Sequence, residues 1–355
     1  MNQITSIEDI VRLAQTGFTD WRKYGYVNVH QQDDLLIFNY NAKAQYEGNW
    51  NFFELASRGL IINYKTGEIV ARAFDKFFNW SEGTRTSSAP IVSVMEKVDG
   101  SLGVLYRVDN EYRIATRGSF DSEQALWATQ YLQANYDLSN LPEEYTLLFE
   151  IIYPENRIVV DYSAREDLVL LAIRNRFTGD YLPFDTVSEI GAKYGFSVPE
   201  VYQIQDVDTL INEIHQLNSD VEGYVVEFAD GQRFKFKSLE YLKLHKLIVT
   251  LSFKNVLKAM QSNTIEQILE TVPDEFLDET RVWINEIEST IERVKQEVQL
   301  VFNEAPKESR RDFALWVNKH HKPMASYLFA MLDEHDITPL IYQRHGWGQN
   351  EEGNE

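Results

Sequence analysis

The chain has 355 residues, 44% of them hydrophobic and 13% aromatic, and a formal net charge of −21. Such a chain can bury one large domain and a smaller one, which excludes an intrinsically disordered protein. It contains no cysteine, which excludes disulfides and thiolate metal sites and is typical of an intracellular protein. The large negative net charge disfavours a protein that binds nucleic acid non-specifically, so an RNA-binding site would have to be a local basic groove.

No apolar run approaches the roughly 18 residues of a membrane helix, and the first residues lack a basic segment followed by an apolar one. We therefore expect neither a membrane span nor a signal peptide. The expected location is the cytoplasm, or the host-cell cytoplasm if the protein is viral, and the expected state is a monomer.

The first part of the chain is predicted to combine one helix with several strands. Ser6 can cap a helix that carries Ile7, Ile10 and Ala14 on one face. Strands are predicted at 21–29, 35–40, 60–64 and 68–74. A polar loop is expected at 41–51, and a loop rich in aromatic residues surrounds Lys76.

The segment Lys97-Val98-Asp99-Gly100 follows a short buried strand, 91–94, and precedes strands at 102–108 and 112–116. Residues two apart in extended backbone share a face, so Lys97 and Asp99 are expected to point into one pocket. Gly100 leaves room for the close approach of a ligand. Taken alone, this motif is a weak signal, because it arises by chance in roughly a few per cent of chains of this length.

Lys97 suits covalent catalysis, provided that its amine becomes neutral. A free lysine, with a pKa of about 10.4, is neutral about once in 2,500 at pH 7, a handicap of roughly 4 to 5 kcal/mol. Nearby cations lower such a pKa, and the sequence offers Lys235 and Lys237, to which a bound metal would add further charge. The alternative is a solvated surface lysine.

Glu150 interrupts the apolar strand 146–153. It shares a face with Leu148 and Ile152, where an unpaired charge is costly. Glu150 therefore either lies at a solvated edge or has a partner, such as a ribose hydroxyl, a metal-bound water or a lysine.

A hairpin further along the chain carries two lysines. Strand 224–228, preceded by Glu222, and the strand with Lys235 and Lys237 flank the turn Asp230-Gly231. Both lysines fall on one face of their strand and phenylalanines on the other, so a polyanion could meet two ammonium groups. An amphipathic strand with a solvated lysine face is the alternative.

In the remaining segments, strands are predicted only before about residue 245. Before that point strands are predicted at 158–162 and 168–173, and helices at 121–136, 185–195 and 206–218. After it, helices are predicted at 264–269, 274–304 and 309–332, and the tail 349–355 is expected to be disordered. The basic stretch 310–322, interleaved with aromatic residues, could meet RNA phosphates.

Several motifs together resemble a known family. K-V-D-G at 97–100, E-G-Y-V at 222–225 and K-F-K at 235–237 resemble motifs I, IV and V of the covalent nucleotidyltransferases, which comprise ATP-dependent ligases and RNA-capping enzymes. Four further features are similar to the phage tRNA-repair type of RNA ligase, the RNA ligase 1 family: S-R-G-L at 57–60, D-K-F-F-N at 75–79, E-N-R-I-V-V-D-Y at 155–162, and Tyr241. The resemblance runs from about residue 50 to 245.

The resemblance implies an α+β fold: a nucleotidyltransferase domain of mostly antiparallel sheets with flanking helices over 1–247, and an all-helical domain over 248–355 that is a candidate for RNA or tRNA binding. It implies an ATP-dependent RNA ligase that works through lysyl-AMP and RNA-adenylate intermediates. The expected substrate is a tRNA with a broken anticodon loop. Whether an end-healing kinase-phosphatase acts with this chain is left open.

The resemblance also assigns roles to residues. The expected catalytic residues are Lys97, Asp99, Glu150, Glu222, Lys235 and Lys237. The expected ATP-binding residues are Arg58, Lys76, Lys97, Gly100, Arg117, Glu150, Lys235, Lys237 and Tyr241. Within this set, Arg58 and Lys76 would contact the β- and γ-phosphates, and Lys235 and Lys237 the α-phosphate. Glu222 and Glu150 would position Mg²⁺, with Mn²⁺ as the alternative metal, through its waters.

Two other interpretations are weighed against this one. A capping guanylyltransferase or a DNA ligase would share the lysine motif but should carry a β-barrel domain after K-F-K, and the helical segments there argue against both. A non-catalytic nucleotide-binding or RNA-binding module is the third interpretation, and the three intact charged motifs argue against it.

Overall fold

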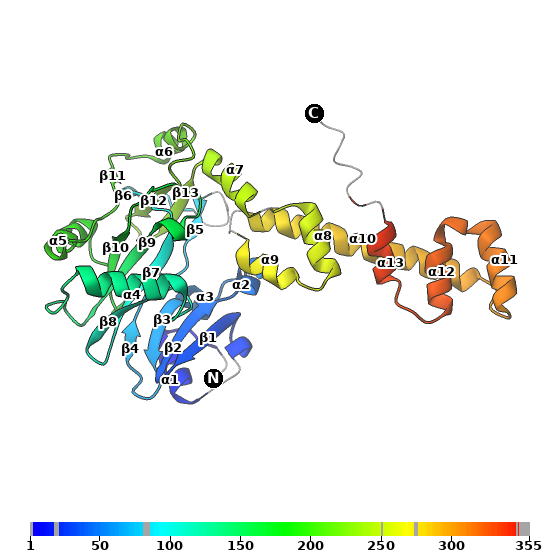
Figure 1. Cartoon of the computed structure of the whole chain (residues 1–355), viewed down its shortest axis with the longest axis horizontal. Helices are drawn as coiled ribbons and strands as arrows, with labels where there is room; N and C mark the ends of the chain where they lie inside the picture. The colour runs from blue at the N-terminus through cyan, green and yellow to red at the C-terminus, as the bar shows by residue number, and fades with distance from the viewer. Residues whose placement is uncertain are drawn as a thin grey trace. The chain divides into compact units, whose positions relative to one another are not determined.

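A computed structural model of the chain describes residues 3–17, 21–80, 86–249, 251–272, 276–345 and 347. The chain divides into two compact units, Met1–Val249 and Thr250–Glu355. In the described residues the first unit combines sheets with helices, and the second is built from helices (Figure 1). The predicted α+β fold class is confirmed.

The first sheet is antiparallel and lies at the start of the chain. Its strands, in spatial order, are β1 (Val27–Gln32), β2 (Leu35–Tyr40), β3 (Arg58–Asn63) and β4 (Ile69–Ala71). Helix α1 (Ile7–Gln15) begins with a capping box, in which the Ser6 hydroxyl accepts from Asp9 N–H and the Asp9 carboxylate accepts from Ser6 N–H. The apolar face of α1 packs with one face of this sheet, including Phe38 and Leu60.

The second sheet is also antiparallel and lies between the first sheet and two helices. Its strands, in spatial order, are β10 (Asp167–Asn175), β9 (Tyr145–Ile152), β7 (Ser101–Val108) and β8 (Glu111–Ala115). One face packs against helices α4 (Glu123–Asn135) and α5 (Phe184–Tyr194). On the other face, Val104 and Leu148 pack with Ile37 and Ile61 of the first sheet, so the core lies between two sheets packed face to face.

The third sheet carries the two later motifs. Its strands, in spatial order, are β11 (Val201–Tyr202), β6 (Ile91–Glu96), β12 (Gly223–Phe228), β13 (Arg233–Lys237) and β5 (Phe78–Asn79), and its pairs are antiparallel except β13 with β5. Helix α6 (Val207–Ile214) covers the face that carries Val226 and Phe234, and helix α7 (Leu239–Ile248) follows β13. Residues 97–100 thus connect β6 of the third sheet to β7 of the second.

The second unit is helical over its described residues. Its elements are α8 (Phe253–Gln261), α9 (Ile265–Thr271), α10 (Leu277–Glu304), α11 (Arg310–His320), the 3₁₀ turn η5 (Lys322–Met324), α12 (Ala325–Leu332) and α13 (Thr338–Arg344). Helix α10 buries Ile284, Ile287, Ile291, Val294 and Val298, which recur at helical spacing. Among the residues described, none of the helices is both long and apolar enough to cross a bilayer.

Three of the element predictions are wrong in part. The strand predicted at 21–29 begins as a 3₁₀ turn, Trp21–Lys23, and becomes extended only at Val27. The loop predicted at 41–51 contains the helix α2 (Ala42–Glu47), which Asn41 caps. The helix predicted at 309–332 breaks near Pro323, because proline has no N–H to continue it. The tail 349–355 lies outside the described residues.

Candidate active site

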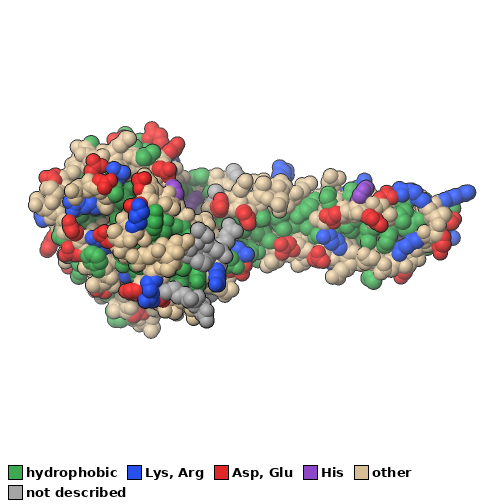
Figure 2. Space-filling model, turned by 90° about the horizontal axis from the view of Figure 1, so that it is seen from below, with side chains coloured by type: hydrophobic (Ala, Val, Ile, Leu, Met, Phe, Trp, Pro, Cys, Tyr) green, Lys and Arg blue, Asp and Glu red, His purple; other side chains and the backbone are tan. Residues whose placement is uncertain are grey.

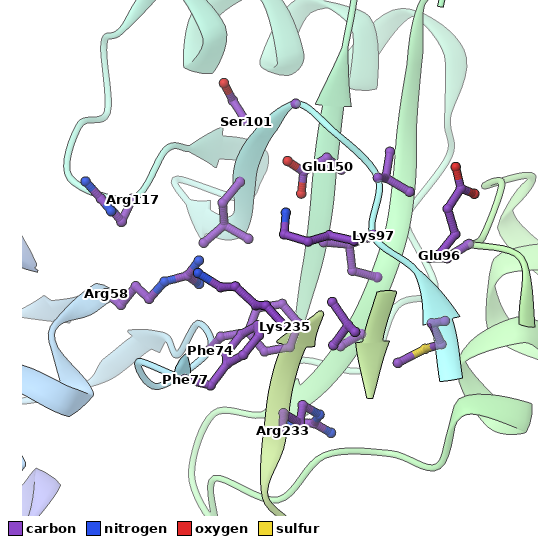
Figure 3. A pocket seen from close by; sticks show the side chains of 18 of the residues that line it. Arg58, Phe74, Phe77, Glu96, Lys97, Ser101, Arg117, Glu150, Arg233 and Lys235 are labelled. Carbon is purple, nitrogen blue, oxygen red and sulfur yellow. The ribbon is translucent and has the colours of Figure 1, made fainter. Parts of the chain in front are cut away.

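A cavity of about 600 Å³ opens where the three sheets approach one another. Six of the residues expected at the site line it: Arg58, Lys97, Gly100, Arg117, Glu150 and Lys235. They come from all three sheets and from the loop after β8. Figure 3 shows Lys97 and Glu150 directed into this space from one side, with Arg58 and Lys235 extending toward it from the other.

Lys97 is positioned by its backbone and by its side chain. Its N–H donates to the carbonyl oxygen of Gly223 at 2.8 Å, which continues the β6–β12 pairing just beyond the strand. Its Nζ lies 2.7 Å from Oε2 of Glu222, and 19% of its side chain is exposed. The amine is therefore held at one place while remaining open to the cavity.

The Glu222 carboxylate forms ion pairs with two lysines. It is 3% exposed, and its Oε1 lies 2.8 Å from Nζ of Lys237. Burial alone would raise the pKa of Glu222, but the ammonium groups of Lys237 and Lys97 bring it down to about 2. The carboxylate is thus ionised at any working pH. Gly223 follows at a φ of 143°, and a Cβ there would collide with the carbonyl oxygen of Phe236, so only glycine fits.

Glu150 lies on β9 and faces the cavity from the second sheet. Among the described residues, nothing donates a hydrogen bond to its carboxylate. Burial raises the pKa of Glu150 to about 7, with the charge of Lys97 opposing the rise and those of Glu222 and Asp99 adding to it. Glu150 is half-buried in the cavity wall, and a carboxylate there without a hydrogen-bond donor is a suitable site for a cation.

The carboxylates of the site fit a magnesium ion that is held mainly by the phosphates of a bound nucleotide. No group of three or more His, Cys, Asp or Glu side chains within the described ranges could enclose a metal. Mg²⁺ needs no such cage, because it keeps several waters and commonly binds through one or two carboxylates plus substrate phosphates. Glu150 is the residue available for it, since both oxygens of Glu222 already contact lysine ammonium groups.

We expect the apparent affinity for Mg²⁺ to rise with pH through Glu150. Since its pKa is about 7, the carboxyl is half protonated near neutrality and must lose its proton to bind a cation. Below that pKa the affinity should increase by up to about tenfold per pH unit, and it should level off above about pH 8. Titrating Mg²⁺ at several pH values in the presence of ATP measures this. Glu150→Gln should remove the pH dependence, and an unchanged slope in that variant would contradict the assignment.

Asp99 does not share the pocket with Lys97, and that prediction is wrong. Its carboxylate is 4% exposed; Oδ2 accepts from the N–H groups of Val159 and Val160, and Oδ1 accepts from the hydroxyl of Tyr241, each at 2.9 Å. The rule that alternate residues share a face fails here because β6 ends at Glu96. Asp99 instead fastens the lysine loop to two other segments.

The same contacts explain why the strand predicted at 158–162 is absent. Backbone N–H groups that would pair with a neighbouring strand donate to the Asp99 carboxylate instead, so the segment stays irregular.

Three residues predicted to contact ATP lie outside the cavity lining: Lys237, whose ammonium group pairs with Glu222, Tyr241 and Lys76. Tyr241 is 1% exposed, and it touches Asp99 and lies 5.5 Å, by its ring centroid, from Nζ of Lys237. Lys76 is buried, with its Nζ 5.3 to 5.5 Å from the ring centroids of Tyr40, Trp50 and Phe78. Lys76 lines a neighbouring cavity of about 170 Å³.

Among the cations that line the cavity, Arg58, Arg117 and Lys235 suit a polyphosphate. Arg58 has a buried Nη1 with no hydrogen-bond partner among the described residues. The Nη1 of Arg117 donates to the hydroxyl of Tyr40 at 3.2 Å, and Nζ of Lys235 lies 5.4 Å from the ring centroid of Phe77. Positive groups fixed around an enclosed space stabilise phosphate charge more strongly than solvated ones.

Sequence reasoning missed Arg233 and Glu96, which also line the cavity. Arg233 shares a strand face with Lys235, so strand alternation could have identified it; it pairs with Glu227 at 3.0 Å and lies 3.9 Å from the ring centroid of Tyr181. Glu96 precedes Lys97, and burial raises its pKa. No sequence signal distinguishes Glu96 from a solvated glutamate.

Comparison with known proteins gives a consistent match. The sequence model of a family described as RNA ligase matches residues 56–243. A protein of Autographa californica nuclear polyhedrosis virus, provisionally named a bifunctional polynucleotide kinase/RNA ligase, is 31% identical over 250 aligned positions, which cover 61% of this chain and 34% of that protein. The RNA ligase of Rhodothermus phage RM378 is 24% identical over 395 aligned positions, which cover 88% of each chain.

A solved structure of a protein from Aquifex aeolicus, provisionally named an ATP-dependent DNA ligase, is also similar. Its TM-score is 0.49 and its identity 18%, and the match covers 82% of this chain and 81% of that one. The chain therefore spans about a third of its viral relative and most of the phage and Aquifex proteins.

Proposed function

The chain belongs to the RNA ligase family, and from this premise we propose that it joins RNA 3′-hydroxyl and 5′-phosphate ends at the expense of ATP. The observation that carries the proposal is the Lys97 amine, held by Glu222 at 2.7 Å and facing a cavity lined with cations. A lysine in this setting is suited to act as a nucleophile toward a nucleoside triphosphate.

The reaction has three phosphoryl transfers. In the first, the neutral Lys97 Nζ attacks the α-phosphorus of ATP; the N–P bond forms, pyrophosphate leaves, and the amine loses a proton. In the second, a 5′-phosphate oxygen of RNA attacks the same phosphorus and the N–P bond breaks, which gives an RNA adenylate. In the third, an RNA 3′-hydroxyl loses its proton and attacks the 5′-phosphate, and AMP leaves.

The residues around Lys97 act mainly through charge and position. Glu222 fixes the amine, which must be neutral when it attacks phosphorus. Lys235, Arg58 and Arg117 would neutralise the phosphates. Mg²⁺, or Mn²⁺, would supply further positive charge when held at Glu150.

We expect Arg58→Ala to slow adenylylation by about 100-fold and to spare the sealing of RNA that is already adenylylated. Its guanidinium lines the cavity with an unpaired Nη1, and the β- and γ-phosphates are absent from the last step. Labelled ATP and chemically adenylylated RNA separate the two activities. Equal loss in both assays would show that Arg58 does not serve the outer phosphates.

Lys76→Ala is the informative companion variant. The family resemblance gives Lys76 the same role, whereas its ammonium lies among three aromatic rings and outside the cavity lining. A loss selective for adenylylation would support the family role and require the ammonium to move when ATP binds. A loss in stability without that selectivity would support a packing role.

We further propose that the helical unit contacts a structured RNA, a tRNA broken in its anticodon loop being the substrate expected. Helix α11 and the turn after it expose Arg311, Lys319 and Lys322. Figure 2 shows Lys and Arg side chains gathered at the end of the helical unit, on an otherwise acidic chain. The name of the viral relative combines a polynucleotide kinase with an RNA ligase, which supports the kinase part of the proposed end-healing kinase-phosphatase as a functional partner.

The charge reversal Arg311→Glu with Lys319→Glu should weaken joining of a nicked tRNA by about tenfold and leave protein adenylylation unchanged, because each phosphate contact contributes to RNA affinity. Arg293→Glu on the acidic helix α10, where Arg293 is also exposed, is the matched control. An unchanged rate with nicked tRNA at physiological salt would exclude these side chains from the RNA surface.

The proposed function is tested by incubating the full chain with α-labelled ATP and Mg²⁺, and then with RNA or DNA carrying 3′-hydroxyl and 5′-phosphate ends. A covalent label that RNA ends discharge, with a joined product, is expected. Label from GTP alone would indicate a capping enzyme, and preference for nicked DNA a DNA ligase. No label with any nucleotide would leave only a binding module.

A further inference from the structure

Asn39 is a polar residue at the end of an apolar strand face. In β2, Leu35 and Ile37 pack in the core between the first and second sheets. Asn39 follows on the same face, beside a bulge, and lines the 600 Å³ cavity. The aliphatic side chains of this face therefore give way to an amide at the cavity, and Asn39 presents a hydrogen-bonding group to a bound ligand.

The two segments that flank Asn39, strand β3 and the loop after β8, each carry an arginine. Asn39 is the cross-strand partner of Arg58 in the β2–β3 register. A Cβ on Gly118 would lie 3.0 Å from Nδ2 of Asn39, so the loop that carries Arg117 packs directly against the amide. Figure 3 shows Arg58 and Arg117 on the same side of the cavity, away from Glu96. The amide therefore belongs to the positively charged end of the cavity.

The amide of Asn39 has no hydrogen-bond partner among the described residues. Its Oδ1 is buried and unsatisfied, and its Nδ2 donates no bond there. The two ends of an asparagine amide are interchangeable by rotation, so either can face a ligand. A buried polar atom without a partner is rare in a folded protein. With the amide rotated so that its nitrogen occupies this position, next to the segments that carry Arg58 and Arg117, it is best satisfied by donating to an anion.

We propose that Asn39 binds the two outer phosphates of the nucleoside triphosphate, the group that leaves as pyrophosphate, by donating from its amide nitrogen to a phosphate oxygen. The inference rests on the proposed function, because it assigns one end of the same cavity. Lys97, which follows a strand of the third sheet, attacks the α-phosphorus. Asn39 and Arg58, on the first sheet, bind the departing pyrophosphate. Asn39 is thus a substrate-binding residue for adenylylation and its reversal only.

The reverse reaction isolates this contact. Purified protein carrying labelled AMP is mixed with increasing inorganic pyrophosphate, and the release of labelled ATP is followed. Asn39→Ala should raise the pyrophosphate concentration for half-maximal release by about 10-fold or more, since one hydrogen bond to a charged group is lost. Asn39→Asp, of the same size, should raise it further by placing a like charge beside the phosphates. Sealing of pre-adenylylated RNA should be unchanged in both.

Asn28→Ala is the matched control. Asn28 is the partner of Asn39 in the β1–β2 register, is exposed and does not line the cavity. It should behave as the wild type. An unchanged pyrophosphate dependence in Asn39→Ala, or an equal loss in sealing of pre-adenylylated RNA with a lowered melting temperature, would overturn the inference. Absence of an AMP adduct in the wild type would instead overturn the proposed function itself.

Discussion

Lys97→Arg is expected to fold normally and to form no protein–AMP adduct, a loss of at least about 1,000-fold in adenylylation rate. Arginine keeps a positive charge that can pair with Glu222, so the buried carboxylate remains compensated. A guanidinium is never deprotonated in proteins, however, and so offers no neutral nitrogen to attack phosphorus. The change therefore removes the nucleophile while leaving the ion pair.

The rate is measured from covalent transfer of labelled AMP under single-turnover conditions. Lys235→Arg is the matched control, because it makes the same chemical change in a second lysine that lines the cavity and that is proposed to contribute charge only. It should retain a measurable adduct. A full-strength adduct in Lys97→Arg would exclude Lys97 as the nucleophile.

Glu222→Ala is expected to lower both stability and activity. Its removal leaves the ammonium groups of Lys97 and Lys237, at 2.7 and 2.8 Å from its oxygens, without their buried counterion. Removing one member of a buried charge cluster costs about 3 to 5 kcal/mol of unfolding free energy. Adenylylation should fall by at least about 100-fold, because Lys97 is no longer held toward the cavity.

The pH dependence of stability provides an independent signature. Since the folded-state pKa of Glu222 is lowered to about 2 from an ordinary value of 4.5, the unfolded state binds more protons between these values. The stabilisation is present in full above about pH 4.5 and is lost as the pH falls toward 2. Denaturant unfolding from pH 7 downward should show this loss in the wild type and a smaller one in Glu222→Gln.

Glu227→Ala is the control for Glu222. It removes a carboxylate from β12, the strand that follows Glu222; this carboxylate pairs with Arg233 at 3.0 Å but is 28% exposed. The cost should be well below that of Glu222→Ala, because solvent screens the remaining charge. If the two variants were destabilised equally, the buried position of Glu222 would not be the source of its effect.

The lysines of the site could be predicted because their signals are local. Alternation in a short strand predicts Lys235 and Lys237 on one face. At Gly100, where room for a ligand was predicted, the close approach is that of the carbonyl oxygen of Ile151, which would lie 2.5 Å from a Cβ. In the structure, Glu222 forms ion pairs with both Lys97 and Lys237, so residues from the three charged motifs lie together. Periodicity likewise predicted a helix over the residues of α10.

The role of Asp99 could not be predicted from local pattern. Its partners Val159 and Tyr241 are 60 and 142 positions away in the chain, and neither has a composition signal that points to a carboxylate. The lysine loop crosses from one sheet to another, and strand alternation has no meaning across such a crossing. The position of Lys76 was missed for the same reason, because Tyr40 and Trp50 are brought to it by the fold.

The most direct test of the account is to locate AMP on the protein. The full chain is incubated with ATP and Mg²⁺, digested under conditions that preserve phosphoramidates, and examined by mass spectrometry. The account predicts one AMP, carried by the peptide that contains Lys97 and discharged when pyrophosphate is added before digestion. AMP on Lys235 or Lys237 instead, or none on any lysine, would contradict it.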